Sequence, residues 1–240
     1  LGFDFGPGGE LLPPPPRRAR RIENVGDSQP AAFGVEGVGF GPDCPGEDYA
    51  ARWQSFRRSF GARLGERFDA EVQGTVYSGK GIVRNIWRPD TETMPVLYDR
   101  SNPLEAASRF DPSSYGNDFA IGQPYDDGTP PLAEFTAGYD AFVGTLRGYY
   151  PEAHVFLATS PSVSDVEPAG RLSRTSVLAA VRAVVEGRNA AGDARVHEAT
   201  ASPATKPELT GCNGHGSPAF HDRVAAELAR IVGPALGWDQ

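Results

Sequence analysis

Gly26, Asp27 and Ser28 form a short motif of a kind that supports nucleophilic catalysis. They directly follow Arg21 to Val25, a run with the character of a β-strand. A serine on a tight turn at a strand end presents its hydroxyl to a cleft, and a preceding glycine permits the turn. Backbone N–H groups beside such a serine can face an oxyanion that develops during acyl transfer. Ser28 is therefore the candidate nucleophile.

A serine hydroxyl is a weak nucleophile without a base, and the sequence offers four histidines. His154 begins an apolar run and His197 lies within another, so we interpret both as structural. His221 falls on a face of the last expected helix, where it would be either solvated or packed. His215 stands in a turn rich in Gly, residues 211–217, just before that helix. Such a loop can place an imidazole over a neighbouring strand end, which makes His215 the candidate base.

The elements that must position these residues alternate along the chain. We expect strands at 21–25, 72–77, 154–159 and 194–199, and helices at 49–64, 135–146, 177–185 and from about 217. Gly65 would end the first helix. This alternation indicates an α/β fold, a mostly parallel sheet with helices on both faces. Functional groups gather at the carboxyl ends of such strands, where Ser28, the turn 78–81 and His215 are expected to meet.

Composition and charge narrow the classes of function. A chain of 240 residues can bury one sizeable core. Its net charge of −8 argues against a large nucleic-acid footprint, and we interpret the basic residues among 17–21 as a solvated edge. No apolar stretch approaches the length of a membrane span. We therefore expect neither a nucleic-acid nor a membrane partner.

The beginning of the chain differs in character from the remainder. Residues 1–16 end in Pro13 to Pro16, a stiff segment typical of linkers. We interpret 1–16 as the tail of an upstream module plus a linker, and 17–240 as the catalytic-type domain. The start has neither an initiator Met nor a signal peptide, as expected of a mature or excised fragment. Cys44 and Cys212 permit one disulfide, which would be worth forming only outside the cytosol.

Four segments carry a likeness to a known family: Arg-Arg-Ile-Glu-Asn-Val-Gly-Asp-Ser (20–28), Ser-Gly-Lys-Gly-Ile-Val-Arg-Asn (78–85), Gly-Asn-Asp-Phe (116–119) and Gly-Cys-Asn-Gly-His (211–215). They resemble the SGNH/GDSL hydrolases and, within them, the acetyl xylan esterases of carbohydrate esterase family 2. The closing Leu-Gly-Trp (236–238) is also similar. The resemblance covers about residues 11–238, and the segment 78–85 is its most specific part.

The resemblance implies a three-layer α/β/α sandwich of the flavodoxin-like SGNH type, preceded in the family by a β-sandwich module. It implies a secreted serine esterase that removes O-acetyl groups from carbohydrates such as xylan or glucomannan, without a metal or other cofactor. Carried over by position, Ser28 is the nucleophile and His215 the base. The oxyanion hole would comprise the backbone N–H groups of Ser28 and Gly79 and the side chain of Asn117. We expect an acetylated carbohydrate as substrate and a monomer.

Three departures from the family pattern modify this expectation. No carboxylate stands two or three residues before His215, so we predict a Ser–His dyad in which the carbonyl of Asn213 or Gly214 orients the ring. Pro30, shortly after Ser28, has no N–H to donate to a first helical turn. The apolar central strand that should precede Gly116-Asn117 is missing or very short, and Met94 to Tyr98 is a candidate substitute.

Other interpretations stay open at this point. Trp87 follows the segment 78–85 and is a candidate for stacking on a sugar ring, with simple packing as the alternative. A broader GDSL lipase or esterase would act on other esters through an apolar acyl cleft. A catalytically impaired carbohydrate-binding remnant is favoured by the missing strand and acid, and opposed by the retained Ser28 and His215.

Overall fold

The computed structural model describes residues 6–40, 43–46, 51–87, 89–109, 131–166 and 170–238, together with the backbone of 119–122. Within these residues five strands form one parallel sheet in the order β2-β1-β3-β4-β5. The strands are β1 (Arg20–Gly26), β2 (Ala70–Val76), β3 (Phe119–Gly122), β4 (His154–Leu157) and β5 (Val196–Glu198). This strand order is that of a doubly wound, flavodoxin-like sheet.

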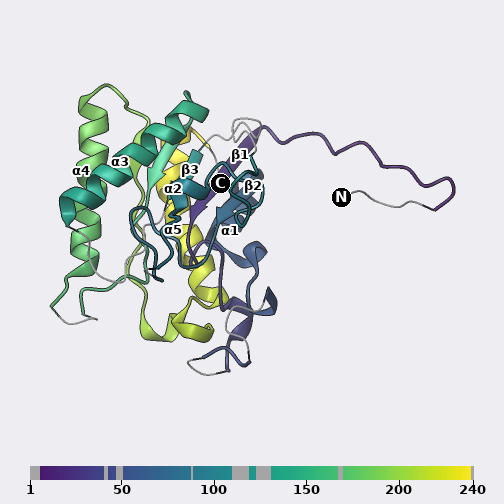
Figure 1. The fold of residues 1–240 in the computed structure, drawn as a ribbon, viewed down its shortest axis with the longest axis horizontal. Coiled ribbons are helices and arrows are strands. Elements are labelled where there is room, and N and C mark those ends of the chain that lie inside the picture. The colour runs from purple at the N-terminus through teal and green to yellow at the C-terminus, as the bar shows by residue number, and fades with distance from the viewer. Residues whose placement is uncertain are drawn as a thin grey trace.

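Helices cover both faces of the sheet (Figure 1). The α-helices are α1 (Phe60–Phe68), α2 (Met94–Leu97), α3 (Leu132–Tyr149), α4 (Ser173–Ala190) and α5 (Pro218–Leu236). Short 3-10 helices are η1 (Val35–Gly37), η2 (Ala51–Trp53), η3 (Phe56–Arg58), η5 (Lys206–Glu208) and η6 (Cys212–Gly214). One hydrophobic core packs α3 and α4 on one face, and a second packs α1 and α5 on the other. The expected three-layer α/β/α sandwich is confirmed.

The two cores follow from the alternation of side chains along the strands. In β4, Val155 and Leu157 belong to the core under α3 and α4, whereas Phe156 belongs to the core under α1 and α5. In β1, Val25 and Ile22 divide between the two cores in the same way. Burial on both faces explains why these strands read as apolar runs in the sequence.

The first helix differs from its prediction. Residues 51–58 form two 3-10 turns, and α1 begins only at Phe60, because the Ser59 side chain caps it by accepting a hydrogen bond from the Ala62 N–H at 3.1 Å. Gly65 does not end the helix, which continues to Phe68. A Cβ atom at Gly65 would lie 2.0 Å from Val72 Cγ2, so this glycine permits close helix–strand packing instead.

The central strand is present, but it follows Gly116-Asn117 instead of preceding it. β3 pairs with β1 on one side and β4 on the other, with Phe119 opposite Ile22 and Gly122 opposite Leu157. It therefore fills the slot that the sequence left open. The suggested substitute at Met94 to Tyr98 is wrong, because Met94–Leu97 is the helix α2.

Residues 6–19 are exposed and form neither strand nor helix. Figure 1 shows this segment extending away from the layered domain. The boundary between residues 16 and 17 stays a prediction. Among the described residues, no helix combines the length and apolarity that crossing a membrane requires.

Candidate active site

Ser28 and His215 lie together at the carboxyl edge of the sheet. The His215 Nε2 atom is 2.9 Å from Ser28 Oγ, and the His215 Nδ1 atom is 2.8 Å from the carbonyl oxygen of Asn213. A carbonyl oxygen can only accept, so Nδ1 must carry the ring proton. Nε2 is then the unprotonated nitrogen, which can accept the proton of the Ser28 hydroxyl. The geometry thus selects the tautomer that a general base needs.

The loop that carries His215 owes its shape to left-handed residues. Asn213 has φ 59° and Gly214 has φ 67°, conformations that asparagine and glycine adopt more readily than other residues. The loop closes where the Gly211 N–H donates to the His215 carbonyl at 3.0 Å. These turns bring the Asn213 carbonyl back onto the ring of His215. Of the two carbonyls proposed as orienter, the structure places that of Asn213 at the ring.

Burial sets the electrostatics of the base. Removal from water lowers the pKa of His215 below its ordinary value of 6.5, because the charged imidazolium loses hydration. Hydrogen bonds to the backbone at Asn213 and Cys212 act in the opposite direction. Among the described residues, no carboxylate is bonded to His215. The ring therefore has a neutral orienter, which stabilises an imidazolium less than a carboxylate does.

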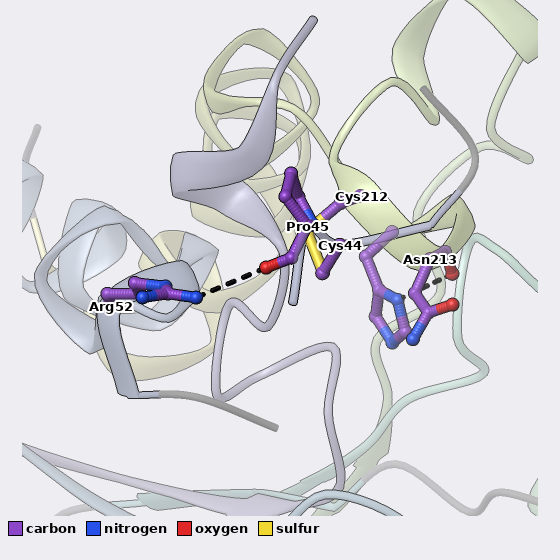
Figure 2. The surroundings of a disulfide bond; sticks show 6 residues. Cys44, Pro45, Arg52, Cys212 and Asn213 are labelled. Atoms are coloured by element: carbon purple, nitrogen blue, oxygen red, sulfur yellow. Dashed lines mark hydrogen bonds between the residues drawn. A yellow bond between two sulfur atoms is a disulfide. The ribbon is translucent and has the colours of Figure 1, made fainter. Parts of the chain in front are cut away.

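A disulfide joins the base loop to the segment after the nucleophile. Cys44 and Cys212 are bonded across a separation of 168 positions, and Asn213 follows directly (Figure 2). The Cys212 N–H also donates to the Gly34 carbonyl at 3.1 Å. Between the two segments, the Phe33 ring meets the His215 ring edge-on at 4.8 Å. Sequence reasoning had left the disulfide open and had not singled out Phe33.

Ser28, the candidate nucleophile, lies in a series of turns rather than at the start of a helix. The Gln29 N–H donates to Asp27 Oδ1 at 3.0 Å, and the Phe33 N–H donates to the Ser28 carbonyl at 3.0 Å. Pro30 lies within these turns, and the next α-helix begins only at Phe60. Asp27 itself is buried, and burial raises its pKa to about 7.

Gly79 presents a backbone N–H near the nucleophile. The end of β2 is tied to the end of β1, because the Tyr77 N–H donates to the Gly26 carbonyl at 2.9 Å. In the part of the chain that the structure describes, nothing accepts a hydrogen bond from the N–H of Ser28 or of Gly79. Both residues border a cavity of about 320 Å³, whose full lining is Ser28, Phe33, Ser78, Gly79, Ile86, Asn213 and His215. Two unengaged donors beside a nucleophile are what an oxyanion hole requires.

Comparison with known sequences finds relatives that are named as esterases. No family model matches the chain. It is 27% identical over 253 residues to the cellulase/esterase CelE of Acetivibrio thermocellus, covering 99% of this chain and 28% of the relative. It is 30% identical over 157 residues to an acetylxylan esterase / glucomannan deacetylase of Cellvibrio japonicus, covering 62% of this chain and 42% of the relative.

Comparison with solved structures also finds carbohydrate esterases. A family two carbohydrate esterase from Clostridium thermocellum, solved in complex with cellohexaose, superposes with a TM-score of 0.86 and 25% identity. The match covers 100% of this chain and 71% of that one. The curated and structural neighbours of this chain are members of carbohydrate esterase family 2. It spans less than half the length of the two curated relatives that it matches.

A larger cavity of about 720 Å³ adjoins the nucleophile pocket. The two share Ser78, Gly79 and Ile86. Trp87 lies on the wall of the larger cavity and is 66% exposed, so its ring is not a core residue. An exposed aromatic ring beside a catalytic pocket is suited to stacking on a sugar.

Asn117, the third expected oxyanion donor, lies outside the described residues. Its place in the chain order can still be compared with those of the other donors. Ser28 follows β1 and Gly79 follows β2, whereas Asn117 precedes β3. A donor that follows β3 in the same way would come after Gly122. The role of Asn117 as an oxyanion donor stays a prediction.

The other histidines are engaged elsewhere. His154 and His197 stack on each other with His154 Nδ1 2.8 Å from His197 Nε2. His221 is fully buried, and its Nδ1 accepts the Phe60 N–H at 3.2 Å. Among the described residues, no cluster of three or more His, Cys, Asp or Glu side chains could hold a metal. Of the four histidines, only His215 is bonded to Ser28.

Proposed function

We propose that this chain is a serine esterase that removes O-acetyl groups from carbohydrate through a Ser28–His215 dyad. The observation that carries the proposal is the 2.9 Å contact between His215 Nε2 and Ser28 Oγ, with Nδ1 held by the Asn213 carbonyl. A nucleophile, its base and an orienter of the base in series make up an acyl-transfer site.

The proposed reaction has two halves. His215 Nε2 takes the proton of Ser28 as the Ser28 oxygen attacks the acetyl carbonyl, and the resulting oxyanion accepts hydrogen bonds from the N–H groups of Ser28 and Gly79. The tetrahedral species collapses, and the sugar oxygen leaves with the proton from Nε2. Water then attacks the acetyl-Ser28 ester with His215 again as base, which releases acetate and restores Ser28. Asn117 remains the proposed third donor.

The two cavities supply places for the two parts of the substrate. The cavity at Ser28 has apolar walls from Phe33 and Ile86, which suit an acetyl methyl group. The adjoining cavity extends to Trp87 and suits the sugar. The name of one relative describes it as an acetylxylan esterase and glucomannan deacetylase, and another relative's structure is described as holding cellohexaose. These names support a polysaccharide or oligosaccharide as the carrier of the acetyl group.

The disulfide supports a secreted location. A bond between Cys44 and Cys212 persists in oxidising compartments and is rare in the cytosol. Substrates of the proposed class are plant polysaccharides, which also lie outside cells.

The test measures acetate release from acetylated xylan and hydrolysis of p-nitrophenyl acetate by the wild type and by Ser28→Ala. Ser176→Ala, on α4, is the matched control and should match the wild type. His215→Gln and its control His154→Gln extend the comparison to the base. Equal rates for the wild type and Ser28→Ala would overturn the proposal. A preference for octanoyl over acetyl esters would favour a broader GDSL esterase, and oligosaccharide binding without turnover would favour a carbohydrate-binding remnant.

A further inference from the structure

Ser78 and Gly79 occupy the middle of a tight turn whose type decides where the Gly79 N–H points. The Lys80 N–H donates to the Tyr77 carbonyl at 3.2 Å, which closes a four-residue turn, and Gly79 has φ 82°. A value near +80° at the third position is that of a type II turn, whereas a type I turn has about −90° there. The two types differ by a flip of the central amide, the amide that carries the Gly79 N–H.

Glycine adopts either turn type at little cost, so its own preference does not hold this amide in place. A contact outside the turn must therefore select between the type I and the type II conformation. A second hydrogen bond holds the other end of the turn, because the Ile86 N–H donates to the Gly79 carbonyl at 2.9 Å. That bond fixes the amide after Gly79, not the amide before it.

Lys80, the last residue of the turn, is anchored by its buried side chain. Its ammonium pairs with the Asp90 carboxylate and donates to the Glu92 carbonyl at 2.8 Å. It also lies 5.4 Å from the centre of the Tyr77 ring. Only 8% of the Lys80 side chain is exposed. A buried ammonium is tolerated when it is paired and bonded in this way, and its geometry is correspondingly fixed.

The partners of Lys80 are themselves held. Asp90 Oδ1 accepts the Glu92 N–H at 3.0 Å, and the Asn85 side chain donates to the carbonyls of both Asp90 and Glu92 at 2.8 and 3.0 Å. Asn85 Oδ1 also accepts the Gly81 N–H at 3.1 Å. The Lys80 hydrogen bond lowers the pKa of Asp90, so that the carboxylate stays charged. Lys80 and Asn85 thus converge on one anchor, residues 90–92.

We propose that Lys80 is a positioning residue for the oxyanion hole: its buried pair with Asp90 keeps the turn 77–80 in the state that aims the Gly79 N–H at the nucleophile pocket. Lys80 acts through Gly79 and does not touch the ester. The inference rests on the proposed esterase function, because it assigns a role within that site. It also gives a physical reason for a lysine directly after Gly79 in the Ser-Gly-Lys-Gly segment.

The test replaces Lys80 by methionine, which keeps most of the chain length and removes the charge. Misplacing a group by about 1 Å can cost roughly 100-fold, so we expect Lys80→Met to lower kcat for p-nitrophenyl acetate about 10- to 100-fold. Its KM should stay within about twofold. Arg84→Met is the matched control, because Arg84 is another cation of this loop and pairs with Glu134 on α3. We expect the control to keep wild-type kcat.

A second measurement separates positioning from general loosening. Methylboronic acid forms a tetrahedral adduct with an active-site serine and presents an oxygen to the oxyanion donors. Its inhibition constant should rise in Lys80→Met by about the factor by which kcat/KM falls, with the variant folded at the assay temperature by circular dichroism. If Lys80→Met does not fold, Asp90→Asn, which keeps an acceptor but removes the charge, is measured in the same way and should show a smaller fall of the same kind.

The outcomes are distinct from those of the esterase test. A folded wild type without Ser28-dependent activity would defeat the proposed function itself. An active wild type whose Lys80→Met variant keeps kcat and boronate inhibition would overturn the role of Lys80 alone. A rise only in KM for acetylated oligosaccharide would also overturn it, since Lys80 would then be a sugar contact in the larger cavity.

Discussion

His215 Nε2 lies 2.9 Å from Ser28 Oγ, although the two residues are 187 positions apart. Ser28 follows the strand β1, and His215 precedes the helix α5. The contact depends on a tautomer, since Nδ1 must donate to Asn213 for Nε2 to accept from Ser28. Anything that moves Asn213 therefore acts on the proton transfer at Ser28.

The pH dependence of turnover should report the neutral form of His215. Burial lowers the pKa of this histidine, so the unprotonated base persists to lower pH than for an exposed imidazole. We expect kcat/KM for p-nitrophenyl acetate to rise with pH along an acid limb whose midpoint lies below 6.5. A midpoint above 7, measured between pH 4 and 8 at constant ionic strength, would contradict this electrostatic account.

The disulfide should support both stability and turnover. Changing Cys44 and Cys212 to serine removes a cross-link over 168 positions, and losses of about 2–5 kcal/mol in unfolding free energy are typical. Turnover should fall as well, because Cys212 adjoins the Asn213 carbonyl that orients His215. Urea unfolding and kcat of the double variant provide the measurement.

Reduction of the wild type serves as the control for this variant. The reduced wild type should behave like the double serine variant, whereas the variant itself should not respond to dithiothreitol. A reduced wild type with full stability and unchanged kcat would show that the loop holds His215 without the bond.

Asp27 should make the protein less stable as the pH rises. Burial raises the pKa of Asp27 to about 7 from 3.8, so the folded state holds a proton that the unfolded state releases. Its contribution to stability is fully present below pH 3.8 and is lost as the pH rises towards 7; the loss is on the order of 4 kcal/mol. Asp27→Asn should flatten this part of the curve of unfolding free energy against pH.

The exposed Asp222 provides the matched control for Asp27. Asp222→Asn changes a carboxylate whose side chain is 57% exposed, and it should leave the shape of the stability curve as in the wild type. The explanation for Asp27 would fail if Asp27→Asn kept the wild-type fall between pH 4 and 7.

Asn117→Ala decides whether the oxyanion hole has a third donor. Losing a donor typically lowers kcat by roughly 100- to 1,000-fold. As the proposed third donor, Asn117 should show a loss of this size in kcat for p-nitrophenyl acetate when it is changed to alanine. A change in kcat of less than about threefold would remove Asn117 from the proposed hole.

Trp87→Ala tests the placement of the sugar. The ring is 66% exposed on the wall of the larger cavity, and an aromatic stacking contact is worth about 0.5–1.5 kcal/mol. We therefore expect KM for an acetylated xylo-oligosaccharide to rise roughly 2- to 10-fold. The KM for p-nitrophenyl acetate, which has no sugar, should be unchanged; equal effects on both substrates would argue against stacking.

The sequence was sufficient for most of the strands and helices and for the dyad candidates. Apolar runs identified the strands around Val25 and Phe156, because a parallel strand is buried on both faces. Ser28 and His215 were recognised because each stands in a turn beside a regular element, and the missing acid directed attention to the carbonyls of Asn213 and Gly214.

The tertiary structure decided what depends on distant partners. Periodicity alone could not show that Ser59 caps the start of α1, or that Gly65 is a contact with Val72 and not a helix stop. The four residues of β3 are too few for a clear pattern, and their place between β1 and β4 exists only through pairing with both.

Within the active site, too, the tertiary structure decided which contacts form. The choice of Asn213 over Gly214 depends on two left-handed residues, and the disulfide depends on the approach of segments 168 positions apart. The sequence by itself determined which groups can react. The sheet and the loop closures determined which of them meet, because hydrogen bonds and packing act between atoms that are close in space, whatever their separation along the chain.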